Sequence, residues 1–358
     1  MPYPFFDLHK LRLIQAPMAG SQNHLLAAAV FKAGGFGSLP AAMLTAEQLR
    51  LELSAFRDTI ASGPQQLASW GAILPVNVNF FCHASPAAQP EKEAAWRLKL
   101  NPLYQAHGID PSSVGAGPGR APFSEESLKI MAAFKPAVVS FHFGLPQAEW
   151  VQQLKAWGIQ IWSSATTVQE ALWLEKHGAD AIIAQGLEAG GHRGMFLTTD
   201  LSTQVGSIAL LPQVLKAVKV PVIAAGGISS TAAVRAAQAL GASAVQVGTA
   251  FLTSPEATTS ALHRQALMSE AARLTALTNL FSGRPARGIV NKFMQDFGPL
   301  HPDAPDFPLA TAALTPLRAA AEALGSSDYS PLWSGQNASD CEALPAAEIT
   351  HKLLQGWV

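Results

Sequence analysis

The residues best suited to chemistry lie in one short run, residues 185–194. Its sequence is Gln-Gly-Leu-Glu-Ala-Gly-Gly-His-Arg-Gly, and the four glycines indicate a sharply bent loop that approaches a ligand closely. A histidine side chain titrates near neutral pH, so His192 in such a loop is a candidate general base, with a buried structural histidine as the alternative. Arg193 is suited either to an anionic substrate or to a nearby carboxylate. We therefore predict a catalytic loop here.

Two further glycine clusters follow apolar runs later in the chain. Gly226 and Gly227 precede three hydroxyl residues, and Gly248 is followed by Thr249. Glycine lets backbone N–H groups approach an anion, and a helix N-terminus adds a favourable dipole. Ordinary tight turns are the alternative for either cluster alone. Together they predict a phosphate site.

Other candidate residues carry weaker signals. His142 ends an apolar run and is either a pocket residue or a hydrogen-bonded core residue. The segment 115–120 is glycine-rich, but its spacing is wrong for a dinucleotide fingerprint, which favours a flexible loop. The chain has ten histidines and two cysteines, yet no two histidines share ligand spacing with a carboxylate, so we expect no metal site.

Short β-rich runs alternate with helical stretches along most of the chain. Such alternation predicts βα units and a parallel sheet. Eight strands are expected at residues 13–17, 36–39, 73–80, 137–141, 159–163, 181–185, 221–225 and 244–248, with helices such as 167–177 and 231–240 between them. Eight units predict an α/β fold, a (β/α)₈ TIM-like barrel, whose active site lies at the carboxyl ends of the strands.

Two regions fall outside the eight units. Residues 82–122 contain a helical pattern at 91–100 and form an insertion into a barrel that spans residues 1–253. Residues 254–325 are predicted as a smaller, mostly helical cap over the substrate site, with helices at 257–280 and 311–324. Residues 326–358 are expected to return to the barrel.

The bulk composition limits the partners. Hydrophobic residues make up 49% of the 358, and the formal net charge is -1, so we expect a large core and no nucleic-acid partner. No apolar stretch approaches the ~18 residues that span a membrane. No secretion signal is recognisable, which predicts a cytoplasmic protein. Monomer and homodimer both remain open.

Four segments, in order along the chain, resemble the signature motifs of class I nitronate monooxygenases, formerly called 2-nitropropane dioxygenases. They are Gln-Ala-Pro-Met-Ala-Gly at 15–20, Ser-Phe-His-Phe-Gly-Leu-Pro at 140–146, the run at 185–194, and Ala-Ala-Gly-Gly-Ile at 224–228. The resemblance covers most of the barrel, and the third motif is highly specific. One departure is the small number of tyrosines, three in all, since some relatives line the substrate pocket with several.

The resemblance implies an FMN cofactor at the barrel mouth and a role for individual residues. His192 takes the catalytic position, with Ser334 lining the mouth beside it, and His142 and Arg193 fall on the substrate side. The residues implied to contact FMN are Pro17, Met18, Ala19, Asn79, Gln185, Gly190, Gly227, Gln246, Val247, Gly248 and Thr249.

The activity implied is the oxidation of alkyl nitronates, such as propionate 3-nitronate, with O₂ to carbonyl compounds and nitrite. The main alternative is an FMN-dependent NAD(P)H oxidoreductase, either a quinone reductase or an enoyl-ACP reductase, which shares the Glu-Ala-Gly-Gly-His core. A barrel dehydrogenase with a nucleophilic cysteine is disfavoured, because Cys82 lacks glycine-rich surroundings. A flavin-binding module without turnover is the remaining alternative.

Overall fold

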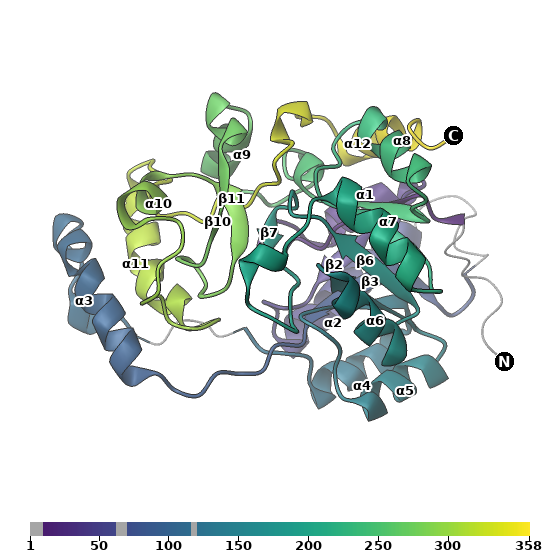
Figure 1. The fold of residues 1–358 in the computed structure, drawn as a ribbon, viewed down its shortest axis with the longest axis horizontal. Coiled ribbons are helices and arrows are strands. Elements are labelled where there is room, and N and C mark those ends of the chain that lie inside the picture. Colours follow the sequence, from purple (N-terminus) through teal and green to yellow (C-terminus); the bar gives the residue numbers. More distant parts are fainter. Residues whose placement is uncertain (1–9, 62–69, 116–119) are drawn as a thin grey trace.

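The computed structural model describes residues 10–61, 70–115 and 120–358, and an eight-stranded parallel sheet forms its centre (Figure 1). Neighbouring strands follow the order β1-β9-β8-β6-β5-β4-β3-β2. All eight predicted strands are confirmed. They are β1 (Leu13–Gln15), β2 (Ser38–Pro40), β3 (Leu74–Phe81), β4 (Pro136–His142), β5 (Gln160–Ala165), β6 (Ala181–Gln185), β8 (Val222–Ala225) and β9 (Ala244–Val247).

The sheet closes on itself next to β1. The backbone N–H of Gln15 donates to the Phe36 carbonyl at 2.9 Å, and the N–H of Phe36 donates to the Leu13 carbonyl at 2.9 Å. These bonds join β1 to the residues just before β2, while β1 pairs with β9 on its other side. The sheet is therefore a barrel, as predicted, and its carboxyl ends meet at one mouth.

Helices follow the strands and cover the outside of the barrel. Strand β3 shows why, because Val76, Val78 and Phe80 pack against helical residues while the alternate Asn77 and Asn79 bond to neighbouring strands. The covering helices are α1 (His24–Lys32), α2 (Ala46–Ala61), α4 (Glu125–Phe134), α5 (Ala148–Ala156), α6 (Val168–Lys176), α7 (Ser207–Ala217), α8 (Thr231–Ala239) and α12 (Ala346–Leu354).

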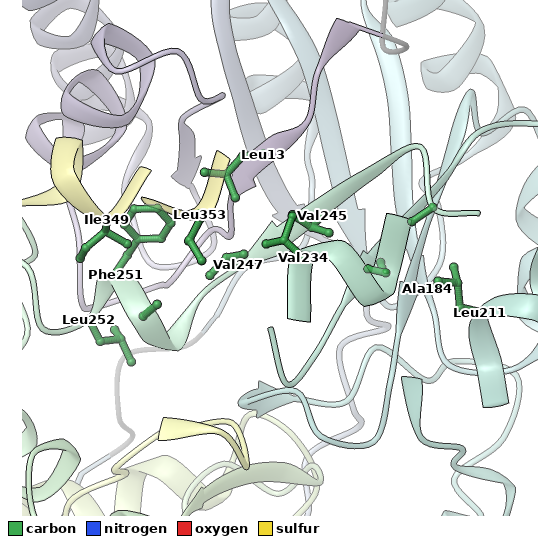
Figure 2. Packing of buried hydrophobic residues seen from close by; sticks show 14 of the residues in the cluster. Leu13, Ala184, Leu211, Val234, Val245, Val247, Phe251, Leu252, Ile349 and Leu353 are labelled. Carbon is green, nitrogen blue, oxygen red and sulfur yellow. The ribbon is translucent and has the colours of Figure 1, made fainter. Parts of the chain in front are cut away.

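The carboxyl-terminal helix completes one side of this outer layer. Figure 2 shows Ile349 and Leu353 of α12 beside Phe251, with Val247 of β9 close by, in one cluster of buried apolar residues. Helix α12, within residues 326–358, therefore packs on the outside of the barrel. Val247 is 1% exposed and belongs to this outer cluster.

A second packed unit stands beside the barrel (Figure 1). Its helices are α3 (Pro90–Ala106), α9 (Ala261–Leu267), α10 (Lys292–Phe297) and α11 (Ala310–Ala323). Buried Trp96 and Leu100 of α3 share an apolar cluster with Phe293 of α10 and with Leu314 and Leu317 of α11. The insertion at 82–122 and the cap at 254–325 therefore form one core together; the domain boundaries themselves stay a prediction.

One predicted helix, at residues 257–280, is wrong. Helix α9 ends at Leu267, a 3₁₀ turn spans Glu270–Arg273, and β10 (Thr275–Thr278) follows. Strand β10 pairs antiparallel with β11 (Ala286–Ile289), which in turn pairs with β7 (Gly191–His192). The cap thus contains a small sheet. Strand β11 follows β10 after a turn, whereas β7 is distant in sequence, and this pairing overrode the local helical pattern.

Shorter 3₁₀ turns complete the described chain at η3 (Pro111–Ser113), η4 (Leu201–Thr203), η5 (Thr249–Phe251) and η7 (Ala338–Asp340), besides η6 at Glu270–Arg273. Among the described residues, none of the helices is long and apolar enough to cross a membrane.

The shared core of α3, α10 and α11 predicts a stability effect. Leu317 is fully buried there, so Leu317→Ala should lower the free energy of unfolding by about 2–5 kcal/mol through lost burial and a residual cavity. Leu324, at the end of the same helix, is 79% exposed, and Leu324→Ala should change stability by less than about 0.5 kcal/mol. Urea unfolding of both variants measures this. Equal effects would contradict the assignment of a packed core.

Candidate active site

A cavity opens at the carboxyl ends of the barrel strands, where the sequence predicted the site. The loops after β1, β6, β8 and β9 contribute most of its wall. Ile183 and Ala225, from the apolar cluster inside the barrel, form part of its floor. Its lining also includes Ala16, Ser21, Pro40, Met43, Phe81, Arg120, Ser164, Ala189, Gly191, Gly226, Ile228, Ser229, Leu252, Trp333, Gly335 and Asn337.

Most of the sequence-predicted site residues meet in this cavity. Those that line it are Pro17, Met18, Ala19, Asn79, His142, Gln185, Gly190, His192, Gly227, Gln246, Gly248 and Thr249. Three others lie outside the lining. Val247 faces the outer helices, Arg193 is fully buried behind the loop, and Ser334 is fully buried between its cavity-lining neighbours Trp333 and Gly335.

The position of His192 depends on the cap as well as on the barrel. It lies in β7, where His192 is paired with Ala286 of β11. Its imidazole Nε2 lies 2.9 Å from the Ser282 hydroxyl oxygen, and that hydroxyl is 3.3 Å from the Arg284 carbonyl oxygen, to which it can donate. Ser282 then accepts from Nε2–H, and the lone pair of the neutral ring is on Nδ1.

His192 is held neutral. Burial lowers the pKa of His192 well below its usual value, and the nearby positive charge of Arg120 lowers it further. A neutral imidazole accepts a proton but does not attract an anion as a cation would. The neutral ring leaves Nδ1 available to accept a proton, while the lowered pKa makes it a weaker base than a free imidazole.

The side chain of His142 hydrogen-bonds to the backbone of the same loop. Its Nε2 lies 3.1 Å from the His192 carbonyl oxygen and its Nδ1 lies 3.0 Å from the Ser164 hydroxyl. A carbonyl only accepts, so Nε2 carries the hydrogen and Ser164 donates to Nδ1. Burial lowers the pKa of His142 to about 3, so this ring is neutral too. Both alternatives from the sequence apply, since His142 lines the cavity and is hydrogen-bonded.

Arg193 holds in place the start of the loop that carries His192. Its guanidinium donates to the carbonyl oxygens of Gln185 and Gly186, each at 2.8 Å, and to the Gln204 side chain at 2.9 Å. These partners are neither a substrate anion nor a carboxylate, the two that the sequence left open. Burial lowers the pKa of Arg193 to about 10, so it stays charged at neutral pH. Its geometry is that of a positioning residue.

Gln185 fixes the loop from the other side. Its amide nitrogen donates to the His192 carbonyl at 3.0 Å, and its amide oxygen accepts from the N–H of Gly194 at 2.8 Å. Gln185 lines the cavity, but its amide bridges the two ends of the turn that carries His192. The orientation of the imidazole therefore follows from bonds that its flanking residues make.

The glycine clusters give the cavity a wall of bare backbone. Gly226 and Gly227 have φ angles of 110° and 72°, a region that side chains other than glycine rarely adopt. A Cβ on Gly190 would lie 2.6 Å from the backbone nitrogen of Gly335. Glu188 anchors the same corner, because its carboxylate accepts from the N–H and hydroxyl of Ser207 and so caps α7.

The carboxyl-terminal segment 333–337 crosses these loops and ties them together. Gly335 N–H donates to the Thr249 hydroxyl oxygen at 2.9 Å, and the Ser229 hydroxyl donates to the Asn337 carbonyl at 2.7 Å. The Asn337 amide donates to the Gly227 carbonyl at 3.3 Å. The loops after β8 and β9 are thereby held in place around one corner of the cavity.

The described lining of the cavity carries positive charge and no negative charge. Arg120 is the cation of the described lining, His142 and His192 are neutral, and no aspartate or glutamate is found among the described lining residues. Gln246 adds a buried amide oxygen that has no hydrogen-bond partner in the described chain. The cavity is thus suited to an anionic ligand that also offers a hydrogen-bond donor.

Sequence reasoning missed three residues of this site. Ser282 comes from the cap and Trp333 from the carboxyl-terminal segment, and neither carried a local motif. Arg120 ends the glycine-rich segment 115–120, which was interpreted as a flexible loop; its residues 116–119 lie outside the described residues. The available signal was a lone arginine after a glycine-rich stretch, which is weak without the fold.

The fold and the site define a (β/α)₈-barrel enzyme with a glycine-walled, cationic cavity at its mouth. Residues 4–356 match the nitronate monooxygenase family. The nitronate monooxygenase of Pseudomonas aeruginosa is 41% identical over 96% of this chain and 95% of its own. The chain belongs to the nitronate monooxygenase family, whose members are flavin-dependent oxidoreductases.

Solved structures agree with this assignment. The crystal structure of nitroalkane oxidase from Streptomyces ansochromogenes superposes with a TM-score of 0.86 at 36% identity, covering 97% of this chain and 96% of its own. FabK from Thermotoga maritima has a TM-score of 0.68 at 24% identity over 97% of this chain and 93% of its own. The second similarity shows a shared fold only.

The contact of Gly190 with the carboxyl-terminal segment predicts a stability effect. In Gly190→Ala the new methyl group would overlap the backbone of Ser334 and Gly335, so stability should fall by about 1–3 kcal/mol. Gly115→Ala is the control, because a Cβ there meets nothing within 4 Å. Thermal unfolding compares the two. A Gly190→Ala variant as stable as the control would show that segment 333–337 is not packed on the loop.

Proposed function

We propose that the cavity binds FMN without a covalent link and that the protein oxidises alkyl nitronates with O₂. The described residues suit this cofactor. The turns at Gly227 and Gly248 bring backbone to the cavity wall, and the Thr249 hydroxyl is close by, a combination that suits a phosphate. The partnerless amide oxygen of Gln246 suits an N–H group of the flavin ring.

Other residues that line the cavity also suit contacts with FMN. Pro17, Met18 and Ala19 give an apolar edge after β1, and Asn79 gives a polar one near the carboxyl end of β3. When bound, FMN supplies the electron-accepting chemistry, and O₂ and the nitronate are the co-substrates. We propose a carbonyl compound and nitrite as products, with short alkyl nitronates and propionate 3-nitronate as substrates.

The observation that carries this proposal is the neutral His192 in a cavity that Arg120 lines as a cation and that has no described carboxylate. The cationic lining attracts an anionic nitronate. The lone pair of His192 can take the α-proton from a neutral nitroalkane and so make the nitronate inside the cavity. A nitronate that arrives already ionised needs no base.

The base role predicts a substrate-dependent loss in His192→Asn. Turnover of neutral nitroethane should fall by about 10²–10⁴-fold, because the proton acceptor is gone, while turnover of ethyl nitronate should fall by less than about 10-fold. Steady-state oxygen consumption measures both. His351→Asn, on the exposed face of α12, is the matched control and should leave both rates unchanged. Equal losses on the two substrates would rule out the base assignment.

The lowered pKa of His192 predicts the pH profile for a neutral nitroalkane. A base works when deprotonated, so a folded-state pKa below 6.5 keeps His192 active from pH 8 down through pH 6.5, with activity lost only at more acidic pH. The measurement is kcat/KM for nitroethane against pH. A half-maximal point at or above 6.5 would contradict the environment described for His192.

The decisive test of the function is an absorption spectrum of the purified protein, followed by anaerobic mixing with ethyl nitronate and, separately, with NADPH. We expect a flavin spectrum that nitronate alone changes rapidly. Fast bleaching by NADPH, with no response to nitronate, would instead assign the protein to the NAD(P)H oxidoreductases. A spectrum without flavin would reject the cofactor proposal itself.

A further inference from the structure

Arg120 reaches the cavity from the cap rather than from the barrel. Its Nη1 donates to the Thr311 hydroxyl oxygen of α11 at 3.0 Å, and its guanidinium lies 5.6 Å from the Phe307 ring centre. Thr311 itself donates to the Phe281 carbonyl at 3.1 Å, so its oxygen is oriented to accept from Arg120. The guanidinium is therefore held in place by cap residues while it lines the cavity.

The charge of Arg120 has no acidic counterpart nearby. No carboxylate forms a salt bridge with it among the residues that the structure describes, and none lines the cavity there. The titratable groups on which its charge acts are His83 and His192, and the pKa of each lies below its usual value. A largely buried cation without a partner is costly, and an anionic ligand removes that cost.

The location of Arg120 decides which end of a substrate it meets. The reacting carbon must lie near His192, which belongs to the loop after β6 at the barrel mouth. Arg120 is fixed to α11 and Phe307, on the cap side. Phe307 is near both groups, because its ring centre lies 5.6 Å from the Arg120 guanidinium and 5.4 Å from the His192 ring centre. A group bound by Arg120 is therefore close to the reacting carbon, at the other end of a short chain.

We propose that Arg120 is a specificity-determining residue that selects nitronates whose far end carries a carboxylate. A planar guanidinium binds a carboxylate through two parallel hydrogen bonds, and the bond to Thr311 orients the guanidinium for this contact. The proposal rests on the function proposed above, because it concerns the substrate of the same cavity.

The test compares two nitronates of similar length, one made from 3-nitropropionate and one from 1-nitrobutane. Arg120→Met should lower kcat/KM for the carboxylated nitronate by about 10–100-fold, mainly through a higher KM, and change that for the uncharged chain by less than about 3-fold. Arg120→Lys should recover part of the loss. Arg50→Met, at an exposed position on α2, is the control and should behave as wild type.

A binding measurement separates this proposal from the function on which it rests. Succinate titrated into the purified protein by calorimetry should bind wild type at least 10-fold more tightly than Arg120→Met. That result supports Arg120 as the carboxylate anchor even if neither nitronate is oxidised, an outcome that would reject only the proposed function. Equal losses on both nitronates, or succinate binding that ignores Arg120, would overturn the proposal.

Discussion

The architecture of this protein depends on the double attachment of the glycine-rich loop after β6. Arg193 binds the backbone carbonyls at the start of this loop from below, and β7, within the loop, pairs with β11 of the cap from above. His192 lies where these two attachments meet. Without the pairing to β11, the loop that carries the imidazole would be attached to the barrel alone. Without the Arg193 bonds, the loop would be attached to the cap alone. The loop therefore connects the two packed units and carries His192.

The electrostatic environment determines the protonation state of the histidines near this loop. The two histidines at the mouth are kept neutral by burial and by neighbouring guanidinium groups. The positive charge of the lining thus resides on Arg120 and not on the imidazoles. In the proposed function, binding of an anion and acceptance of a proton therefore fall to different side chains, which avoids the conflict that one histidine would face in doing both.

Local sequence predicted the barrel well, since each βα unit carries its own signal. Strand β6 and helix α8 lie where apolar β-rich and alanine-rich runs placed them. The glycines and His192 were found because their loop lies directly after a strand, and the barrel rule then brings such loops to one mouth. The cap was harder. Residues 275–278 fall in a run with a helical pattern, and they form a strand because β11, after a turn, offers an edge for pairing.

The sequence by itself determined the eight-stranded barrel, the order of its loops and the residue types in the catalytic loop. These properties depend on hydrophobic periodicity and on glycine geometry, which act over a few residues. Only the tertiary structure decided that Arg193 is a positioning residue and that Val247 faces the helices. It also decided that Arg120 and Ser282 join the site. The side-chain direction of a residue and its partners across 90 or more positions follow from packing between distant segments, which no local pattern records.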